Sequence, residues 1–281
     1  MPTPPRVALL GSTRLSRVVI PWLVDQGRAR VVSLDPGEED ETLPWFAPLR
    51  GRCRDLGVPL GRRPADLTLD LDPDTRPTVG EGVMVRVSAP PAAASPDLNR
   101  ALLVDGAWEM VVATADGRGA WARAAVEVEP EDEAEDLLDR ATLRGLEALA
   151  GCFEALLAGG PTEPLPAPLR GGRWRDQERL LTWELPASRL HRRVRAAAGP
   201  WGGARATLGE TPLSIHRAAL IHDEPVPGFS PGTVVDTSDG IDVACGRGLL
   251  RLLHVQPGWR PARSARLYAR EIGLSPGYML A

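Results

Sequence analysis

The sequence predicts an α/β domain with a parallel-rich sheet, followed by a small antiparallel β domain. The chain opens with an apolar run, a glycine turn, an apolar helical segment and a second apolar run, an order typical of a βαβ unit. Five short segments separated by Gly and Pro fill residues 205–255. A Pro-rich stretch at residues 159–168 lies between the two regions, and 281 residues are enough for two domains.

The βαβ opening consists of expected strands at residues 6–10 and 30–34 with a helix over 15–24 between them. In a parallel sheet, ligands bind at the carboxyl ends of the strands, so the expected ligand edge lies near Gly11. The turn after the first strand lacks the Gly-x-Gly-x-x-Gly pattern. A dinucleotide cofactor is therefore not supported.

The next segment is rich in Pro, Asp and Arg, and we expect a helix over residues 45–56 and a strand over 66–72. Asp and apolar residues alternate in that strand, which is typical of a half-buried position. The Asp residues do not form a calcium loop, because no glycine turn or closing Glu follows them. We expect no metal site here.

A long helix should close the first domain. Acidic residues cluster at 131–139, where the positive end of the helix dipole favours them. We expect one continuous core stripe on this helix, formed by Leu143, Leu146, Leu149, Phe153 and Leu157. The predicted organisation is a first domain at residues 1–158, a Pro-rich linker at 159–182 and a second domain at 183–281.

The second domain should begin with a basic helix after Pro186. Leu190, Val194 and Ala197 recur at helical steps and form one apolar face. The other face carries Arg189, Arg192, Arg193 and Arg195, and Gly199-Pro200 ends the helix. Short strands then follow at residues 205–208, 213–221, 232–236, 240–244 and 249–255. This pattern predicts a small open β-barrel of the OB type.

Composition is that of an ordinary globular protein whose only strong base is arginine. Hydrophobic residues make up 43% and charged residues 25% of the chain, and all 33 basic residues are Arg. Residues 190–281 hold 11 Arg and 7 acidic residues, a net charge of +4. The other 189 residues hold 22 Arg and 30 acidic residues, a net charge of −8. This asymmetry favours a polyanionic partner for the C-terminal region, and ordinary solvated surface is the alternative.

Cysteine usage and apolar runs predict the compartment. Cys53, Cys152 and Cys245 are odd in number and widely spaced, without a Cys-x-x-Cys pair or clustered His. They predict neither a disulfide framework nor a zinc site. The first apolar run is too short for a signal peptide, and no later run is long enough to cross a bilayer. We expect a cytoplasmic protein without a membrane partner.

A family resemblance begins at the basic helix. Trp183, Leu190-His191, Arg195, Pro200-Trp201 and Gly203-Ala204 resemble the beginning of the C-terminal domain of methionyl-tRNA formyltransferases. Residues 211–218, 231–234 and 240–256 resemble that domain's strands in order and spacing, and residues 6–12 resemble the first strand of formyltransferase catalytic domains. The resemblance implies a Rossmann-like formyltransferase domain followed by an OB-like β-barrel domain.

The resemblance also implies a site and a cofactor. In that family, an Asn polarises the formyl oxygen of 10-formyltetrahydrofolate, a His manages the proton of the incoming amine, and an Asp orients the His. These roles suit a reaction through a tetrahedral oxyanion. With one added residue in the alignment, Arg86 takes the Asn position and Ser88 the His position. Without it, Val85 and Val87 take them.

The third position departs from the pattern as well. Asp116 follows the strand that should lead to the Asp motif, and it matches an earlier, non-catalytic acid of the family. Ala120-Trp121-Ala122 stand where the family has Leu-Asp-Thr. All four His residues, at 191, 216, 222 and 254, lie in the predicted second domain. The expected N-terminal domain therefore contains no imidazole.

Three hypotheses follow. The favoured one is a divergent family member that has lost formyl transfer and acts as a binding or scaffolding pseudoenzyme, with a protein partner possible. The second is an active formyltransferase on tRNA or a small amine that uses replacement residues and 10-formyltetrahydrofolate. The third is a module that binds tRNA or another polyanion.

The resemblance implies tRNA contact through basic residues of the C-terminal domain. The candidates for this contact are Arg192, Arg193, Arg195 and Arg205, and a second set consists of Arg260, Arg263, Arg266 and Arg270. Ordinary surface Arg in a chain without Lys is the alternative for both sets.

Overall fold

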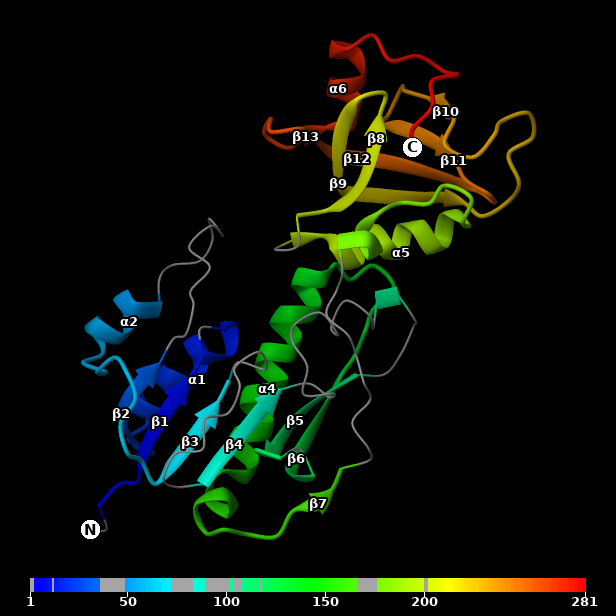
Figure 1. Cartoon of the computed structure of the whole chain (residues 1–281). Coiled ribbons are helices and arrows are strands. Elements are labelled where there is room, and N and C mark those ends of the chain that lie inside the picture. The colour runs from blue at the N-terminus through cyan, green and yellow to red at the C-terminus, as the bar shows by residue number, and fades with distance from the viewer. Residues whose placement is uncertain are drawn as a thin grey trace. The chain divides into compact units, whose positions relative to one another are not determined.

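The computed structural model shows two compact units (Figure 1). It describes residues 3–11, 13–35, 49–71, 83–88, 102–103, 108–116, 118–165, 176–199 and 202–281. The first unit comprises residues 1–98, 107–127 and 137–173, and the second comprises 99–106, 128–136 and 174–281. The first residues of the predicted helix 45–56, part of the predicted linker and the turn at Pro200-Trp201 lie outside the described residues.

The first unit contains a sheet in the order β2-β1-β3-β4-β5-β6-β7. Its strands are β1 (Arg6–Leu10), β2 (Arg30–Asp35), β3 (Leu67–Asp70), β4 (Val83–Ser88), β5 (Trp108–Thr114), β6 (Gly119–Val126) and β7 (Glu163–Pro164). Strands β2, β1, β3 and β4 are parallel to one another, whereas β5, β6 and β7 add antiparallel pairs. The predicted α/β fold with a parallel-rich sheet is confirmed.

Strand β3 keeps the predicted alternation in its first part, where Leu67 and Leu69 are buried while Asp66 is exposed and Thr68 is partly exposed. It departs from the pattern at Asp70, which is 1% exposed, so the second face is also covered at the end of the strand. The reason is its position between β1 and β4, because central strands of parallel sheets are covered on both sides.

The helices that the structure describes wholly or mainly in this unit are α1 (Arg14–Asp25), α2 (Leu49–Asp55) and α4 (Ala134–Leu157). Helix α1 begins at a capping box, in which the Ser16 amide donates to Thr13 Oγ1 and the Thr13 amide donates to Ser16 Oγ. Among the described residues, no helix combines the length and the hydropathy needed to cross a bilayer.

Helix α4 corrects the predicted core stripe. Leu149 and Phe153 are fully buried as expected, but Leu143 is 58% exposed. Leu143 lies six residues before Leu149, which at about 3.6 residues per turn places it on a different face. The stripe runs instead through Gly145, where an added Cβ would lie 2.9 Å from Cε of Met110 in β5. The buried residues of α4 include Leu137, Ala141, Ala148, Leu149, Cys152, Phe153 and Leu156.

The second unit contains a curled antiparallel sheet in the order β10-β11-β12-β9-β8, with β13 paired to β12. Its strands are β8 (Ala204–Leu208), β9 (Thr211–His222), β10 (Val234–Asp236), β11 (Ile241–Ala244), β12 (Leu249–Pro257) and β13 (Arg263–Ser264). They cover the five predicted strands, and β13 was not predicted. The unit also contains the 3-10 helix η1 (Asp176–Arg179) and the helices α5 (Ala187–Ala197) and α6 (Ala265–Glu271). The OB-like class is confirmed.

The last residues of the chain join the two ends of this curled sheet. Beside β10, the Val234 amide donates to the Tyr278 carbonyl (2.7 Å) and the Leu280 amide donates to the Gly232 carbonyl (2.8 Å). Beside β8, Thr207 and Ala281 exchange backbone hydrogen bonds of 2.6 and 2.9 Å. Residues 277–281 therefore cover the edges of both terminal strands, which would otherwise be unpaired.

Helix α5 packs its predicted apolar face into the core of the second unit. Leu190, Val194 and Ala197 are at most 1% exposed. The segment that precedes α4 also docks here, because Arg195 donates through Nη1 to the Asp132 carbonyl at 2.8 Å. This contact explains why residues 128–136 cluster with the second unit rather than with the rest of α4.

We predict that Leu280→Ala destabilises the second unit by about 2–5 kcal/mol, because the side chain is 3% exposed and its removal leaves a cavity. Chemical denaturation and amide exchange at Thr207 and Leu280 would measure the effect. The matched control is Met279→Ala, whose side chain is 57% exposed and which should change stability by at most about 0.5 kcal/mol. Equal effects of the two variants would contradict the closing role of this segment.

A second prediction concerns pH. Burial lowers the pKa of His191 in α5, Arg195 and Arg192 lower it further, and Glu131 and the Ala218 backbone oppose them. Because the folded-state pKa lies below the ordinary value near 6.5, protonation favours the unfolded chain. The stabilising contribution is present above the ordinary pKa and is lost as pH falls through it.

Thermal unfolding of the full chain between pH 7.5 and 5.5 would check this prediction. His191→Asn should lose less stability on acidification than the wild-type chain does. The control is His254→Asn, since His254 is exposed. If the wild type and His191→Asn show the same pH slope, His191 does not contribute to it.

Candidate functional site

The carboxyl ends of β1, β3 and β4 lie at one edge of the parallel sheet, where ligands of such sheets bind. Gly11 follows β1 with a φ of 103°, a conformation that favours glycine. Thr13 Oγ1 donates to the Leu71 carbonyl (2.9 Å), and Ser16 Oγ donates to the Gly11 carbonyl (2.9 Å). These bonds tie the start of α1 to the ends of β1 and β3, so both hydroxyl hydrogens are engaged within the fold.

The predicted positions Arg86 and Ser88 both lie in β4. Arg86 is the register partner of Asp70 in β3 and of Ala113 in β5, and Ser88 is the last residue of the strand. The side chains of Arg86 and Ser88 lie outside the described part of the chain.

The alternative alignment uses Val85 and Val87, which are 0% and 1% exposed. Buried valines can neither donate a hydrogen bond to an oxyanion nor accept a proton. The described side chains of β4 itself, Val85 and Val87, therefore supply neither an oxyanion donor nor a proton acceptor.

Asp116 lies in the turn between β5 and β6, where its Oδ1 accepts hydrogen bonds from Thr114 Oγ1 (2.6 Å) and from the Arg118 amide (3.1 Å). The bond from Thr114, followed by that from Arg118, lowers the pKa of Asp116. Thr114 pairs with Val85, whereas Val111 pairs with Ser88. Asp116 therefore lies beyond the Val85 end of this ladder, and the register does not bring it beside Ser88.

The position that should hold the catalytic Asp has a structural role. Residues 120–122 lie within β6, and Trp121 donates through Nε1 to the Gly160 carbonyl (3.1 Å). This bond fixes the chain after α4 onto β6. No carboxylate is available at this place in the strand.

The free cysteines do not supply a nucleophile. Cys53, Cys152 and Cys245 are buried and unbridged. Burial raises the pKa of Cys152 to about 11 and that of Cys245 to about 12. Both thiols stay protonated near neutral pH, which makes them poor nucleophiles and poor metal ligands. The described residues contain no group of three or more metal-binding side chains.

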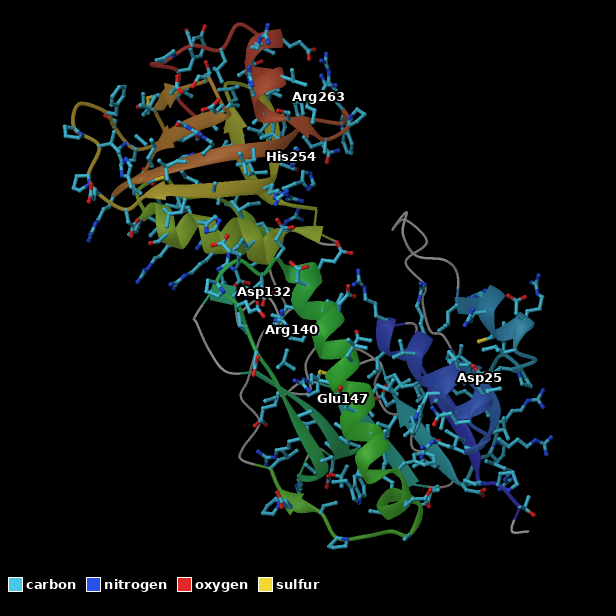
Figure 2. The ribbon with its side chains drawn as sticks, turned by 180° about the vertical axis from the view of Figure 1, so that it is seen from behind. Asp25, Asp132, Arg140, Glu147, His254 and Arg263 are labelled. Carbon is cyan, nitrogen blue, oxygen red and sulfur yellow. The ribbon has the colours of Figure 1, made fainter. Side chains whose placement is uncertain are left out.

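The first basic set lies on α5 and, with Arg205, on β8, and one of its residues is not exposed as predicted. Arg195 was expected on the solvated face, but it is 8% exposed and bound to the Asp132 carbonyl (Asp132 is labelled in Figure 2). Arg193 is half-buried and donates through Nη1 to the Leu180 carbonyl at 2.7 Å, and burial lowers its pKa. Arg192 and Arg205 are partly exposed, and their contact with RNA stays a prediction.

The second basic set lies on the turn after β12 and on α6. Arg260 and Arg263 both form ion pairs with Glu271, at 3.2 and 2.6 Å. Arg266 and Arg270 are exposed. Sequence reasoning missed Trp259 in the same turn, which is fully exposed at 103%. The sequence signal that could have identified it was its position between Gly258 and Arg260, at the start of a segment rich in arginine.

Comparison with known proteins agrees with this architecture. Residues 173–272 match the family described as formyl transferase, C-terminal domain. The chain is 36% identical over 162 residues to the methionyl-tRNA formyltransferase of Methylobacterium sp. strain 4-46, covering 56% of this chain and 50% of that protein. It is 33% identical over 214 residues to that of Roseiflexus sp. strain RS-1, covering 76% and 53%.

A solved structure extends the likeness to the fold of both regions. The N-formyltransferase from Helicobacter canadensis, in complex with folinic acid and dTDP-3-aminofucose, has a TM-score of 0.66 at 10% identity and covers 89% of this chain and 98% of that chain. At this identity the likeness shows the fold alone. The chain spans about half the length of the curated relatives it matches. Residues 173–272 match the formyl transferase C-terminal domain family, and the chain is similar to methionyl-tRNA formyltransferases over part of their length.

Proposed function

We propose that this chain keeps the formyltransferase architecture without formyl transfer and acts as a cytoplasmic binding or scaffolding protein. The observation that carries the proposal is the absence of His from residues 1–190. The positions in β4 that face the family's chemistry are Arg86 and Ser88, or Val85 and Val87. None of these side chains is an ordinary proton acceptor near neutral pH.

The chemistry explains why this absence matters. Formyl transfer to an amine forms a tetrahedral oxyanion and releases a proton from nitrogen. Loss of the acid–base group typically costs about 10²–10⁴ in rate, and loss of an oxyanion donor costs about 10²–10³. The two losses do not simply multiply. A serine without an adjacent base does not replace the imidazole, because its hydroxyl is not a proton acceptor near neutral pH.

Folate binding and formyl transfer are separate properties in this proposal. Bound 10-formyltetrahydrofolate would supply the formyl group, and the Helicobacter canadensis neighbour was solved with folinic acid. Because the described side chains of β4 offer no acid–base group, we assign no reaction step to this chain through the folate. Retention of the folate pocket is a separate property that binding measurements can test.

We predict that the purified full chain transfers no formyl group from 10-formyltetrahydrofolate to methionyl-tRNA or to a small amine above the uncatalysed rate. A methionyl-tRNA formyltransferase assayed in parallel is the positive control. Isothermal titration with folinic acid measures pocket retention independently, and saturable binding without turnover identifies a pseudoenzyme. Turnover that Ser88→Ala abolishes would instead establish an active enzyme with replacement residues.

We also propose RNA, tRNA included, as the partner of the second unit. The support is the net charge of +4 over residues 190–281, against −8 for the rest of the chain. Phosphate contacts by guanidinium groups release counterions, so such binding weakens steeply as salt rises. A protein partner that is not a polyanion would show no such dependence.

Gel shifts of the full chain with bulk tRNA across 50–200 mM salt, on the order of the range over which phosphate contacts lose affinity, test this partner. We expect binding whose logarithm falls linearly with the logarithm of salt. The control is Arg52→Ala with Arg54→Ala, two exposed residues of α2 in the first unit, which should leave the slope unchanged. Absent or salt-independent binding would remove RNA as the partner.

A further inference from the structure

The turn between β12 and β13 presents a tryptophan that packs against nothing. Trp259 is 103% exposed, yet the backbone around it is held in place. The Arg260 amide donates to the Pro257 carbonyl (3.1 Å), and the Gly258 amide donates to the Pro212 carbonyl (2.8 Å). The turn therefore holds a large aromatic ring in water without stabilising the fold by burying it.

Four arginines follow Trp259 along the chain, one in the turn, one in β13 and two in α6. Arg260 and Arg263 pair with the same residue of α6, Glu271, which brings the turn and the helix together. Arg266 and Arg270 lie four residues apart on α6, a spacing that places them on one side of a helix. Figure 2 labels Arg263 at this end of the second unit.

Glu271 is the only acidic residue between positions 257 and 274, so four Arg and one Glu leave a local net charge of +3. We define the hairpin–α6 surface as Trp259, Arg260, Arg263, Arg266 and Arg270. It combines one exposed ring with an excess of guanidinium groups, in a chain whose overall net charge is −4.

We propose that the hairpin–α6 surface binds single-stranded nucleic acid, with Trp259 stacking on an unpaired base and the arginines contacting phosphates. The inference rests on the proposed RNA partner and names the surface that contacts it. Every base has a π-face, so an exposed ring accepts unpaired bases regardless of sequence. A duplex stacks its own bases and offers only phosphates to such a surface.

The choice of this surface over α5 rests on Trp259, because both regions contain arginines that other residues hold. Arg195 of α5 is buried, and Arg193 is held by the Leu180 carbonyl. On the hairpin–α6 surface, Arg266 and Arg270 are exposed. An anionic bilayer is the less suitable partner, because membrane binding scales with buried apolar area, and the large exposed apolar side chains here are only those of Trp259, Leu267 and Ile272 among the described residues 257–274.

Fluorescence anisotropy of the full chain with a labelled oligouridylate of about 12 nucleotides, within the length that one such domain covers, tests the stacking. Trp259→Ala should weaken binding roughly 5- to 150-fold, whereas Trp259→Phe should keep most of the affinity. Affinity for the same strand paired with oligoadenylate should not respond to Trp259→Ala. The matched control is Tyr278→Ala, an aromatic residue that is 55% exposed in the closing segment, and it should bind like the wild type.

The charge contribution is tested separately. Arg266→Gln with Arg270→Gln should reduce the salt slope by about 0.7 for each phosphate that the variant no longer neutralises, while thermal melting verifies that each variant is folded. The proposal is overturned if Trp259→Ala binds as tightly as the wild type, or if it loses equal affinity for single strand and duplex. It is also overturned if Arg192→Ala weakens oligonucleotide binding more than Trp259→Ala does. Binding to phosphatidylglycerol vesicles, but not to the oligonucleotide, that depends on Trp259 would overturn it as well.

Different results would contradict the RNA partner and the hairpin–α6 surface. If the wild-type chain binds neither tRNA nor the oligonucleotide, the RNA partner and this surface are both wrong. If RNA binds and Trp259→Ala has no effect, only this surface is wrong. Formyl transfer activity bears on neither outcome.

Discussion

Pairing of the sheet edges is the constraint on which the second unit depends. A curled sheet that stopped at β8 and β10 would leave rows of unpaired backbone groups, which are costly when buried and prone to wrong pairing when exposed. Residues 277–281 bond to Gly232 and Val234 on one side and to Thr207 on the other. The Leu181 amide, 2.8 Å from the Arg205 carbonyl, covers another part of the β8 edge.

In the first unit, the described contacts at the sheet edge serve the fold and do not need catalytic residues. The parallel pairing of β1 with β2 matches what the βαβ opening predicts, and the ends of β1 and β3 are joined by Thr13 and Ser16. Fold requirements explain these features, because each bond satisfies a backbone carbonyl or caps a helix. None of them requires a catalytic group at the end of β4. A sheet of this kind can therefore persist when acid–base residues are replaced, which is why shared architecture does not transfer activity.

Arginine content alone does not identify a binding surface in this chain. Arg195 and Arg266 both sit on predicted or observed helices, yet Arg195 is buried against the Asp132 carbonyl and Arg266 is exposed. The difference comes from residues 128–136, which dock on α5 from a distant part of the sequence. Helical periodicity at α5 could not include that segment. Leu143 is a different case, because its place on the helix, six residues before Leu149, already puts it on another face.

By itself, the sequence determined the βαβ opening, the long helix that ends the first domain, the OB-like second unit, and the absence of His from residues 1–190. These are properties of local patterns and of composition, which need no knowledge of distant contacts. Only the tertiary structure decided that Asp116 lies beyond the Val85 end of the β4–β5 ladder, that residues 277–281 close the sheet, and that Trp259 is fully exposed. The physical reason is that register, burial and edge pairing depend on contacts between residues far apart in the chain.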